Sequence, residues 1–173
     1  MTTDFDRAMV LYRQSRFDLA ERFFRGFLAV DPKSWLAHAY IAYCLAEQRR
    51  TKQAVEEGRE AVRLAPEAAF AYYVLAKALF QAKTLTAAQR AIDEAIRLDP
   101  SRVCYFSLKA AILFDRRRRR AALACAQSGL RIASCMRVPR GQILLHFPGP
   151  RAAAPILAGR WVMVTGKATG WPR

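Results

Sequence analysis

The chain has 173 residues, of which 53% are hydrophobic, and its 29 Lys and Arg residues outnumber 14 Asp and Glu residues to give a net charge of +15. This hydrophobic content is enough for a buried core, but no run of about 18 apolar residues offers a membrane span. The N-terminus is acidic and lacks the basic start and apolar run of a signal peptide, so we expect a cytoplasmic protein.

The first 32 residues predict two amphipathic helices that form a hairpin. Apolar residues recur at helical spacing on either side of a polar turn, Ser15-Arg16. Asp31-Pro32 should end the second helix, because proline lacks an amide hydrogen and disfavours the helical conformation of the residue before it. Ser34 then stands where its hydroxyl can cap the next helix.

The same pattern returns every 34 residues, and Pro66 and Pro100 follow Pro32 at this interval. Alanine keeps the same step in two columns: Ala8, Ala42, Ala76 and Ala110, and Ala20, Ala54, Ala88 and Ala122. This pattern resembles the tetratricopeptide repeat (TPR) family, whose unit is a helix-turn-helix of about 34 residues. The resemblance implies an all-α array of about four helical hairpins, with repeats at residues 1–34, 35–68, 69–102 and 103–134.

Two of the repeats depart from the family pattern. Thr51 and Gly58 stand where the family prefers aromatic residues, so we expect the second hairpin to pack less tightly than the first and third. The fourth repeat has Ser134 where the proline would fall. We interpret it as the last repeat, because terminal repeats are atypical when one face lacks a neighbour.

Residues 135–173 hold five of the eight prolines and five of the eight glycines. We predict a basic and poorly ordered tail, because prolines and glycines this frequent leave no uninterrupted stretch for a helix of useful length. Two short apolar pieces, residues 143–145 and 161–164, are candidate strands or docking segments. The composition is also what an out-of-frame reading of GC-rich DNA would produce, and this alternative stays open.

The sequence offers little support for catalysis, so we expect neither an enzyme nor a cofactor or metal site. Cys44, Cys104, Cys125 and Cys135 form no Cys-x-x-Cys pair, and three of them fall in predicted helices, where we expect buried thiols. His38 lies in an aromatic packing column and is interpreted as a buried or half-buried core histidine.

The resemblance also implies a binding surface, because the first helix of each repeat lines the concave face of a TPR array. The residues placed there are Phe5, Met9, Tyr12, Leu36, Tyr40, Tyr43, Phe70, Tyr73, Lys77 and Phe80. Such a surface suits an extended or helical peptide with apolar anchors, since aromatic rings bury much area at low entropic cost. The alternative for each ring is packing between neighbouring helices. We therefore expect a protein or peptide partner and a scaffold, adaptor or chaperone-like role.

Two TPR subfamilies give more specific expectations. One binds acidic C-termini of chaperones through a clamp of Lys, Asn, Asn, Lys and Arg. At the matching places this chain has Phe5, Met9, Tyr40, Phe70 and Val74, which cannot form that clamp. The other, the small chaperones of type III secretion, is similar in size but carries an extra helical region before its repeats.

A run of arginines falls at the expected turn of the last repeat: Arg116, Arg117, Arg118, Arg119 and Arg120. Residues 116–173 hold 12 basic and no acidic residues, whereas residues 1–115 hold 17 basic and 14 acidic residues. The run suits nucleic acid or an anionic membrane, and the alternative is a solvated turn. Nucleic acid is the less favoured partner, because no aromatic residues are interleaved with the run. A further alternative is that the chain is the repeat portion of a larger enzyme.

Overall fold

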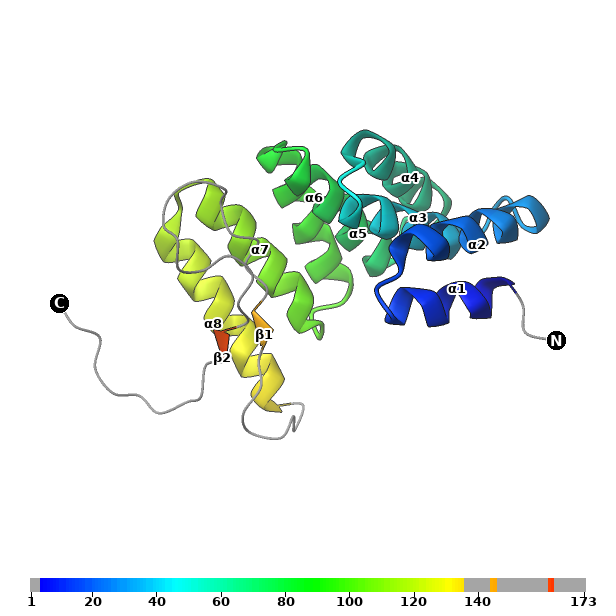
Figure 1. Ribbon diagram of the computed structural model, residues 1–173. Coiled ribbons are helices and arrows are strands. Elements are labelled where there is room, and N and C mark those ends of the chain that lie inside the picture. Colours follow the sequence, from blue (N-terminus) through cyan, green and yellow to red (C-terminus); the bar gives the residue numbers. More distant parts are fainter. Residues whose placement is uncertain (1–3, 136–143, 146–161, 164–173) are drawn as a thin grey trace. The chain divides into compact units, whose positions relative to one another are not determined.

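Figure 1 shows the computed structural model, which describes residues 4–135, 144–145 and 162–163. The described helices are α1 (Asp4–Arg13), α2 (Phe17–Val30), α3 (Trp35–Glu47), α4 (Thr51–Leu64), α5 (Ala69–Gln81), α6 (Leu85–Leu98), α7 (Val103–Asp115) and α8 (Arg119–Cys135). The strands β1 (Leu144–Leu145) and β2 (Val162–Met163) pair antiparallel. The predicted all-α array of four hairpins is confirmed. The predicted tail covers residues 135–173, and apart from Cys135 and the two short strands it lies outside the described residues.

The contacts between Cα atoms divide the chain into two compact units, Met1–Pro100 and Ser101–Arg173. The N-terminal unit contains α1 to α6, which are the first three hairpins (Figure 1). The C-terminal unit contains the fourth hairpin, formed by α7 and α8, together with the two short strands.

All four hairpins close with the same turn. One residue of each turn has a left-handed backbone: Ser15 (φ 59°), Arg49 (φ 65°), Lys83 (φ 61°) and Arg117 (φ 58°). In the first hairpin the Arg16 amide donates to the Leu11 carbonyl and the Ser15 amide donates to the Tyr12 carbonyl, both at 3.0 Å. The corresponding bonds recur in the other three hairpins, so each first helix ends in a Schellman motif.

The second helices end where proline predicts. Helix α2 stops at Val30, immediately before Asp31-Pro32. The prediction for Ser34 is wrong, because Ser34 occupies the N-cap position of α3 but its side chain makes no capping hydrogen bond. The backbone of Asp31 closes this turn instead: its carbonyl accepts a hydrogen bond from the Ser34 amide at 3.3 Å.

Small residues let the helices of the N-terminal unit approach one another closely. The alanines of both repeat columns are fully buried in this unit: Ala8, Ala20, Ala42, Ala54, Ala76 and Ala88. Phe24, Ile41, Leu45 and Ile92 are among the largest fully buried side chains beside them. Because a larger side chain in an alanine column would separate neighbouring helices, these columns fix the spacing of the hairpins.

Gly58 brings α4 against α5. A Cβ atom at Gly58 would lie 3.2 Å from the Leu75 Cα and 3.4 Å from its Cβ, which is tighter than ordinary van der Waals contact. Helices α3 and α4 pack as extensively as α5 and α6. The prediction of a looser second hairpin is therefore wrong, and the position that lacks an aromatic ring allows α4 to approach α5 of the next hairpin closely.

One polar contact in this unit links the first and second repeats, and another links the two helices of the second repeat. The Glu21 side chain on α2 is buried, and its carboxylate accepts hydrogen bonds from Gln48 Nε2 at 2.9 Å and from Arg50 Nη1 at 3.0 Å. On α3, Nδ1 of His38 lies 2.7 Å from Oε2 of Glu57, which belongs to α4. The His38 side chain is half-buried, as predicted.

In the C-terminal unit, α7 and α8 pack around buried residues that include Tyr105, Ile112 and Leu113. Cys44 is buried, as the sequence predicts, and Cys125 is half-buried. The same prediction is wrong for Cys104, which is exposed. Cys104 is the second residue of α7, and its position in the first turn leaves the side chain uncovered.

Candidate functional site

The ten residues that the resemblance places on the concave face all come from α1, α3 and α5. Helix α3 packs directly against α5. Phe80 is only 7% exposed and belongs to the core, so the expectation that it offers binding surface is corrected. The other nine are partly exposed and are called here the first-helix surface: Phe5, Met9, Tyr12, Leu36, Tyr40, Tyr43, Phe70, Tyr73 and Lys77.

The Tyr40 ring is the centre of this surface. It stacks on Phe24 with 5.2 Å between ring centroids and an interplanar angle of 5°. The Tyr12 ring meets it edge to face with 5.1 Å between centroids, and the Phe70 ring is tilted against it at 5.2 Å. Tyr40 therefore links α1, α3 and α5, and much of its area serves packing between repeats.

Tyr12 and Tyr43 form a second contact between the first two repeats. Their ring centroids lie 5.2 Å apart in an edge-to-face arrangement. Burial, followed by the interaction with Tyr43, raises the pKa of the Tyr12 phenol well above its usual value. Tyr12 is therefore a neutral group that offers a hydroxyl and a ring edge.

Lys77 covers the face of Tyr43. Its ammonium nitrogen lies 3.6 Å from the centre of the Tyr43 ring, and it also forms an ion pair with Glu47. The exposed fractions of the two charged side chains are 16% for Lys77 and 31% for Glu47. This cation–π contact and ion pair place a neutralised charge beside the aromatic rings of the first-helix surface.

Phe70 and Tyr73 lie together on α5, with ring centroids 6.2 Å apart and an interplanar angle of 30°. Leu36 on α3 is also partly exposed. Ring contacts thus connect Phe5, Tyr12, Tyr40, Tyr43, Phe70 and Tyr73 into one continuous row over three repeats. Leu36 and Tyr73 are partly exposed members of the first-helix surface with apolar area.

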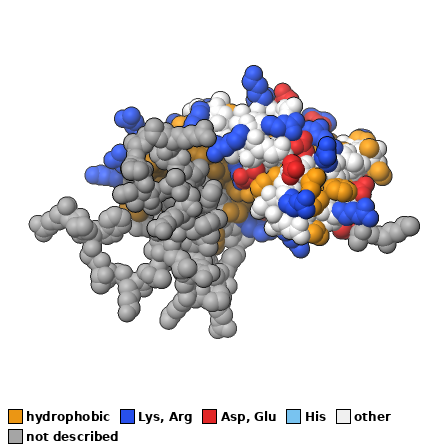
Figure 2. Space-filling model, viewed as in Figure 1, with side chains coloured by type: hydrophobic (Ala, Val, Ile, Leu, Met, Phe, Trp, Pro, Cys, Tyr) orange, Lys and Arg blue, Asp and Glu red, His pale blue; other side chains and the backbone are white. Residues whose placement is uncertain are grey.

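The sequence did not predict two open hollows in the N-terminal unit. One has a volume of about 420 Å³ and is lined by Asp18, Glu21, Arg22, Gln48 and Arg50. The other has a volume of about 490 Å³ and is lined by Trp35, Ala65, Pro66, Glu67 and Ala68. In Figure 2, hydrophobic side chains of this unit reach the surface in small groups among charged ones.

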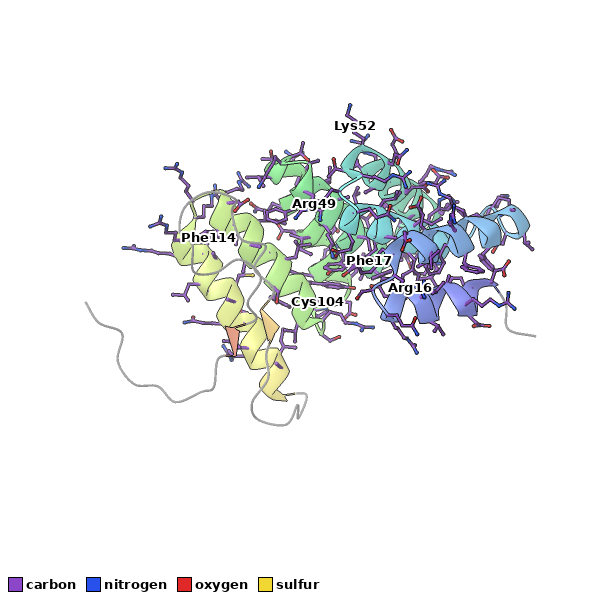
Figure 3. All side chains as sticks on the ribbon, in the orientation of Figure 1. Arg16, Phe17, Arg49, Lys52, Cys104 and Phe114 are labelled. Carbon is purple, nitrogen blue, oxygen red and sulfur yellow. The ribbon has the colours of Figure 1, made fainter. Side chains whose placement is uncertain are left out.

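The arginine run (residues 116–120) spans the turn between α7 and α8, as predicted. Arg116 is half-buried at the C-terminus of α7, and the four arginines after it are exposed. Arg117 is the left-handed residue of the turn. Figure 3 shows Phe114 at this end of the hairpin, near long side chains that end in nitrogen.

The described residues contain no group of three or more His, Cys, Asp and Glu side chains placed to hold a metal ion. Among the helices of residues 4–135, none is long and apolar enough to cross a membrane.

Comparison with known proteins gives a clear family match. The family model described as tetratricopeptide repeat matches residues 5–69 and 59–103. No curated protein sequence matches at a significant level.

Several solved structures share the fold. The structure of TTC0263, a thermophilic TPR protein of Thermus thermophilus, is 20% identical over 76% of this chain and 73% of its own, with a TM-score of 0.71. MamA from Desulfovibrio magneticus RS-1 is 19% identical over 78% of this chain and 76% of its own, with a TM-score of 0.68. The first TPR domain of Spaghetti (RPAP3), bound to the HSP90 peptide SRMEEVD, is 18% identical over 70% of this chain and 90% of its own, with a TM-score of 0.59.

At sequence identities of 20% or less, these structural similarities show only the fold. The family model is what shows that the chain is a member of the family. Its matches together cover residues 5–103, which is more than half of the chain. The chain belongs to the tetratricopeptide repeat family.

Proposed function

We propose that this TPR protein is a non-catalytic interaction module whose first-helix surface binds an apolar peptide segment of a partner protein. The observation that carries the proposal is the continuous row of half-buried rings over three consecutive first helices. Such rings are already held in place by one another, so a ligand gains apolar contact with little additional loss of side-chain entropy.

The chemistry of the surface favours a peptide with apolar anchors and few charges. Lys77, the charged residue of the first-helix surface, forms an ion pair with Glu47, so a ligand meets a pair of opposite charges with no net charge. The RPAP3 domain, a structural neighbour, is bound to an acidic HSP90 peptide. Residues of the matching clamp positions in this chain are apolar or aromatic, and Val74 among them is fully buried. An acidic C-terminal tail is therefore not the expected ligand.

The partner can be an extended strand or a helix that lies along the surface. Tyrosine hydroxyls provide hydrogen-bonding groups beside apolar ring area, a combination that suits a peptide backbone with alternating side chains. A scaffold, an adaptor and a chaperone for a partner segment all fit this mode of binding.

Peptide selection from a random library, followed by affinity measurement, tests the proposal. The double variant Leu36→Ala and Tyr73→Ala should weaken binding of the selected peptide about thirtyfold, equivalent to about 2 kcal/mol, because it removes two partly exposed apolar side chains of the first-helix surface. The matched control is Val10→Ala with Val30→Ala, which trims exposed apolar residues that lie outside the first-helix surface. Equal affinity of the wild type and the Leu36 and Tyr73 variant would contradict the proposal.

A further inference from the structure

Two large apolar side chains are exposed at the tip of the last hairpin. Phe114 on α7 is 51% exposed and Leu123 on α8 is 62% exposed. One and three repeats earlier along the chain, the residues at the position of Phe114 are covered: Phe80 is 7% exposed, and Tyr12 packs on the rings of Tyr40 and Tyr43. The exposure is therefore a property of the last hairpin.

The arginine run lies between these two side chains along the chain, after the exposed Asp115. Residues 117–120 are all exposed. Arg119 and Arg120 precede Leu123 by four and three residues, so they share one face of α8 with it. Helix α8 contains no acidic residue.

The tip is also held in a defined conformation. The Arg117 amide donates to the Phe114 carbonyl and the Arg118 amide donates to the Leu113 carbonyl, both at 2.9 Å. The Ala122 amide then donates to the Arg118 carbonyl at 2.9 Å, which joins the run to α8. The backbone that carries the arginines is therefore fixed between Phe114, near the end of α7, and the first turns of α8, which carry Leu123.

We propose that this tip binds the surface of an anionic lipid bilayer. The arginines pair with lipid phosphates and carboxylates at the headgroup level, and Phe114 and Leu123 insert at the boundary with the acyl chains. Nucleic acid would use the arginines and could stack a base on Phe114, but it offers no apolar site for the aliphatic Leu123. An apolar protein face would cover Phe114 and Leu123 but would leave the arginines without opposite charge. The bilayer surface satisfies both kinds of side chain, and the tip shares no residue with the first-helix surface.

Co-flotation of the full chain with vesicles tests this inference. Vesicles of phosphatidylcholine mixed with phosphatidylserine should retain the protein at low salt, and vesicles of phosphatidylcholine alone should not. Replacing residues 117–120 by serine should weaken binding about fivefold for each arginine removed. Replacing Phe114 and Leu123 by serine should weaken it about tenfold, with little change in the salt dependence.

Matched variants separate the tip from general charge and general hydrophobicity. The charge control replaces four exposed basic residues of the N-terminal unit by serine: Lys33, Lys52, Arg59 and Arg90. The apolar control is Val30→Ser, at a position that is 83% exposed. A Phe114→Trp variant adds a spectroscopic readout, because its extra fluorescence should shift to shorter wavelength with the anionic vesicles.

Three outcomes would overturn the inference. The first is that the charge control weakens vesicle binding as much as the arginine variant, which would mean that net charge alone acts. The second is that Phe114→Ser with Leu123→Ser leaves vesicle binding unchanged, while the arginine variant no longer binds an RNA homopolymer that the wild type binds. The third is that substitution of the same two apolar residues abolishes self-association, measured by light scattering, without changing vesicle binding.

Discussion

Arg49 illustrates how single residues of this chain adopt a conformation that their type disfavours. A non-glycine residue in the left-handed region brings its Cβ close to the following carbonyl oxygen, at a cost of about 1–2 kcal/mol. Arg49 holds φ at 65° because its own amide and the next one close the Schellman motif of α3. Hydrogen bonding at the helix end offsets the steric cost, and glycine would remove that cost.

Arg49→Gly should therefore raise the free energy of unfolding by about 0.5–1 kcal/mol, which is the relief of strain less the extra entropy of the unfolded chain. Urea denaturation of the full chain measures the change. Arg59→Gly is the control, because Arg59 is exposed inside α4 and the substitution should lower stability by about 1 kcal/mol. Loss of stability in both variants would mean that the turn is not left-handed in solution.

Cys44 gives the chain a pH dependence in the alkaline range. Burial, followed by the nearby Glu21 and Glu47, raises the pKa of the Cys44 thiol from 9.0 to about 12. The unfolded chain loses this proton near pH 9, whereas the folded chain keeps it to about pH 12. Stability is therefore fully present below pH 9 and is lost as pH rises toward 12.

Cys44→Ala should flatten the fall of the melting temperature above pH 9, although it also lowers stability at every pH by leaving a small cavity. Thermal unfolding followed by circular dichroism over this range measures the slope. Ile41→Val, at a buried position on the same helix, is a control that lowers stability but keeps the slope. An unchanged slope in Cys44→Ala would show that the thiol does not titrate in this way.

At the scale of the elements, Gly58 decides how closely α4 and α5 pack. Gly58→Ala should lower the free energy of unfolding by about 1–2 kcal/mol, because the new methyl group meets the backbone of Leu75 at 3.2 Å. Gly26→Ala is the matched control on α2, where a Cβ has only Asp4 Oδ2 nearby, at 3.8 Å. The control should gain about 0.5–1 kcal/mol from helix propensity. Equal gains in denaturation experiments on both variants would mean that α4 and α5 stand farther apart than described.

The helices and their order follow from the sequence because proline and alanine recur at a fixed interval that local rules can interpret. The details that sequence reasoning missed depend on neighbouring elements. The left-handed turn residue Arg49 is not a glycine, so the sequence gives no sign of its conformation. The turn is recognised from the hydrogen bonds between amides after the helix end and carbonyls of the last helical turn. In the sequence, Gly58 is only a position that lacks the family's aromatic residue. The structure shows that α5 occupies the space in which a side chain would lie. Ser34 has the right type and position for a cap, but Asp31 closes that turn.

At the scale of the whole molecule, the candidate site depends on three repeats acting together. The sequence assigned the candidate residues to the first helices, and they lie on α1, α3 and α5, because the repeat interval fixes which positions share a face. It could not show how the rings divide between packing and exposure. The Tyr40 ring packs between repeats and Phe80 is buried, while Leu36 and Tyr73 are partly exposed.

Site-specific photo-crosslinking tests the proposed binding surface most directly. Benzoyl-phenylalanine replaces Tyr73 in one full-length variant and Val30 in another, and each is irradiated with the peptide selected from the library. We predict a crosslinked product from the Tyr73 position whose yield falls when Leu36→Ala is added, and none from the Val30 position. A product from the Val30 position alone, or one at Tyr73 that Leu36→Ala leaves unchanged, would contradict binding at the first-helix surface.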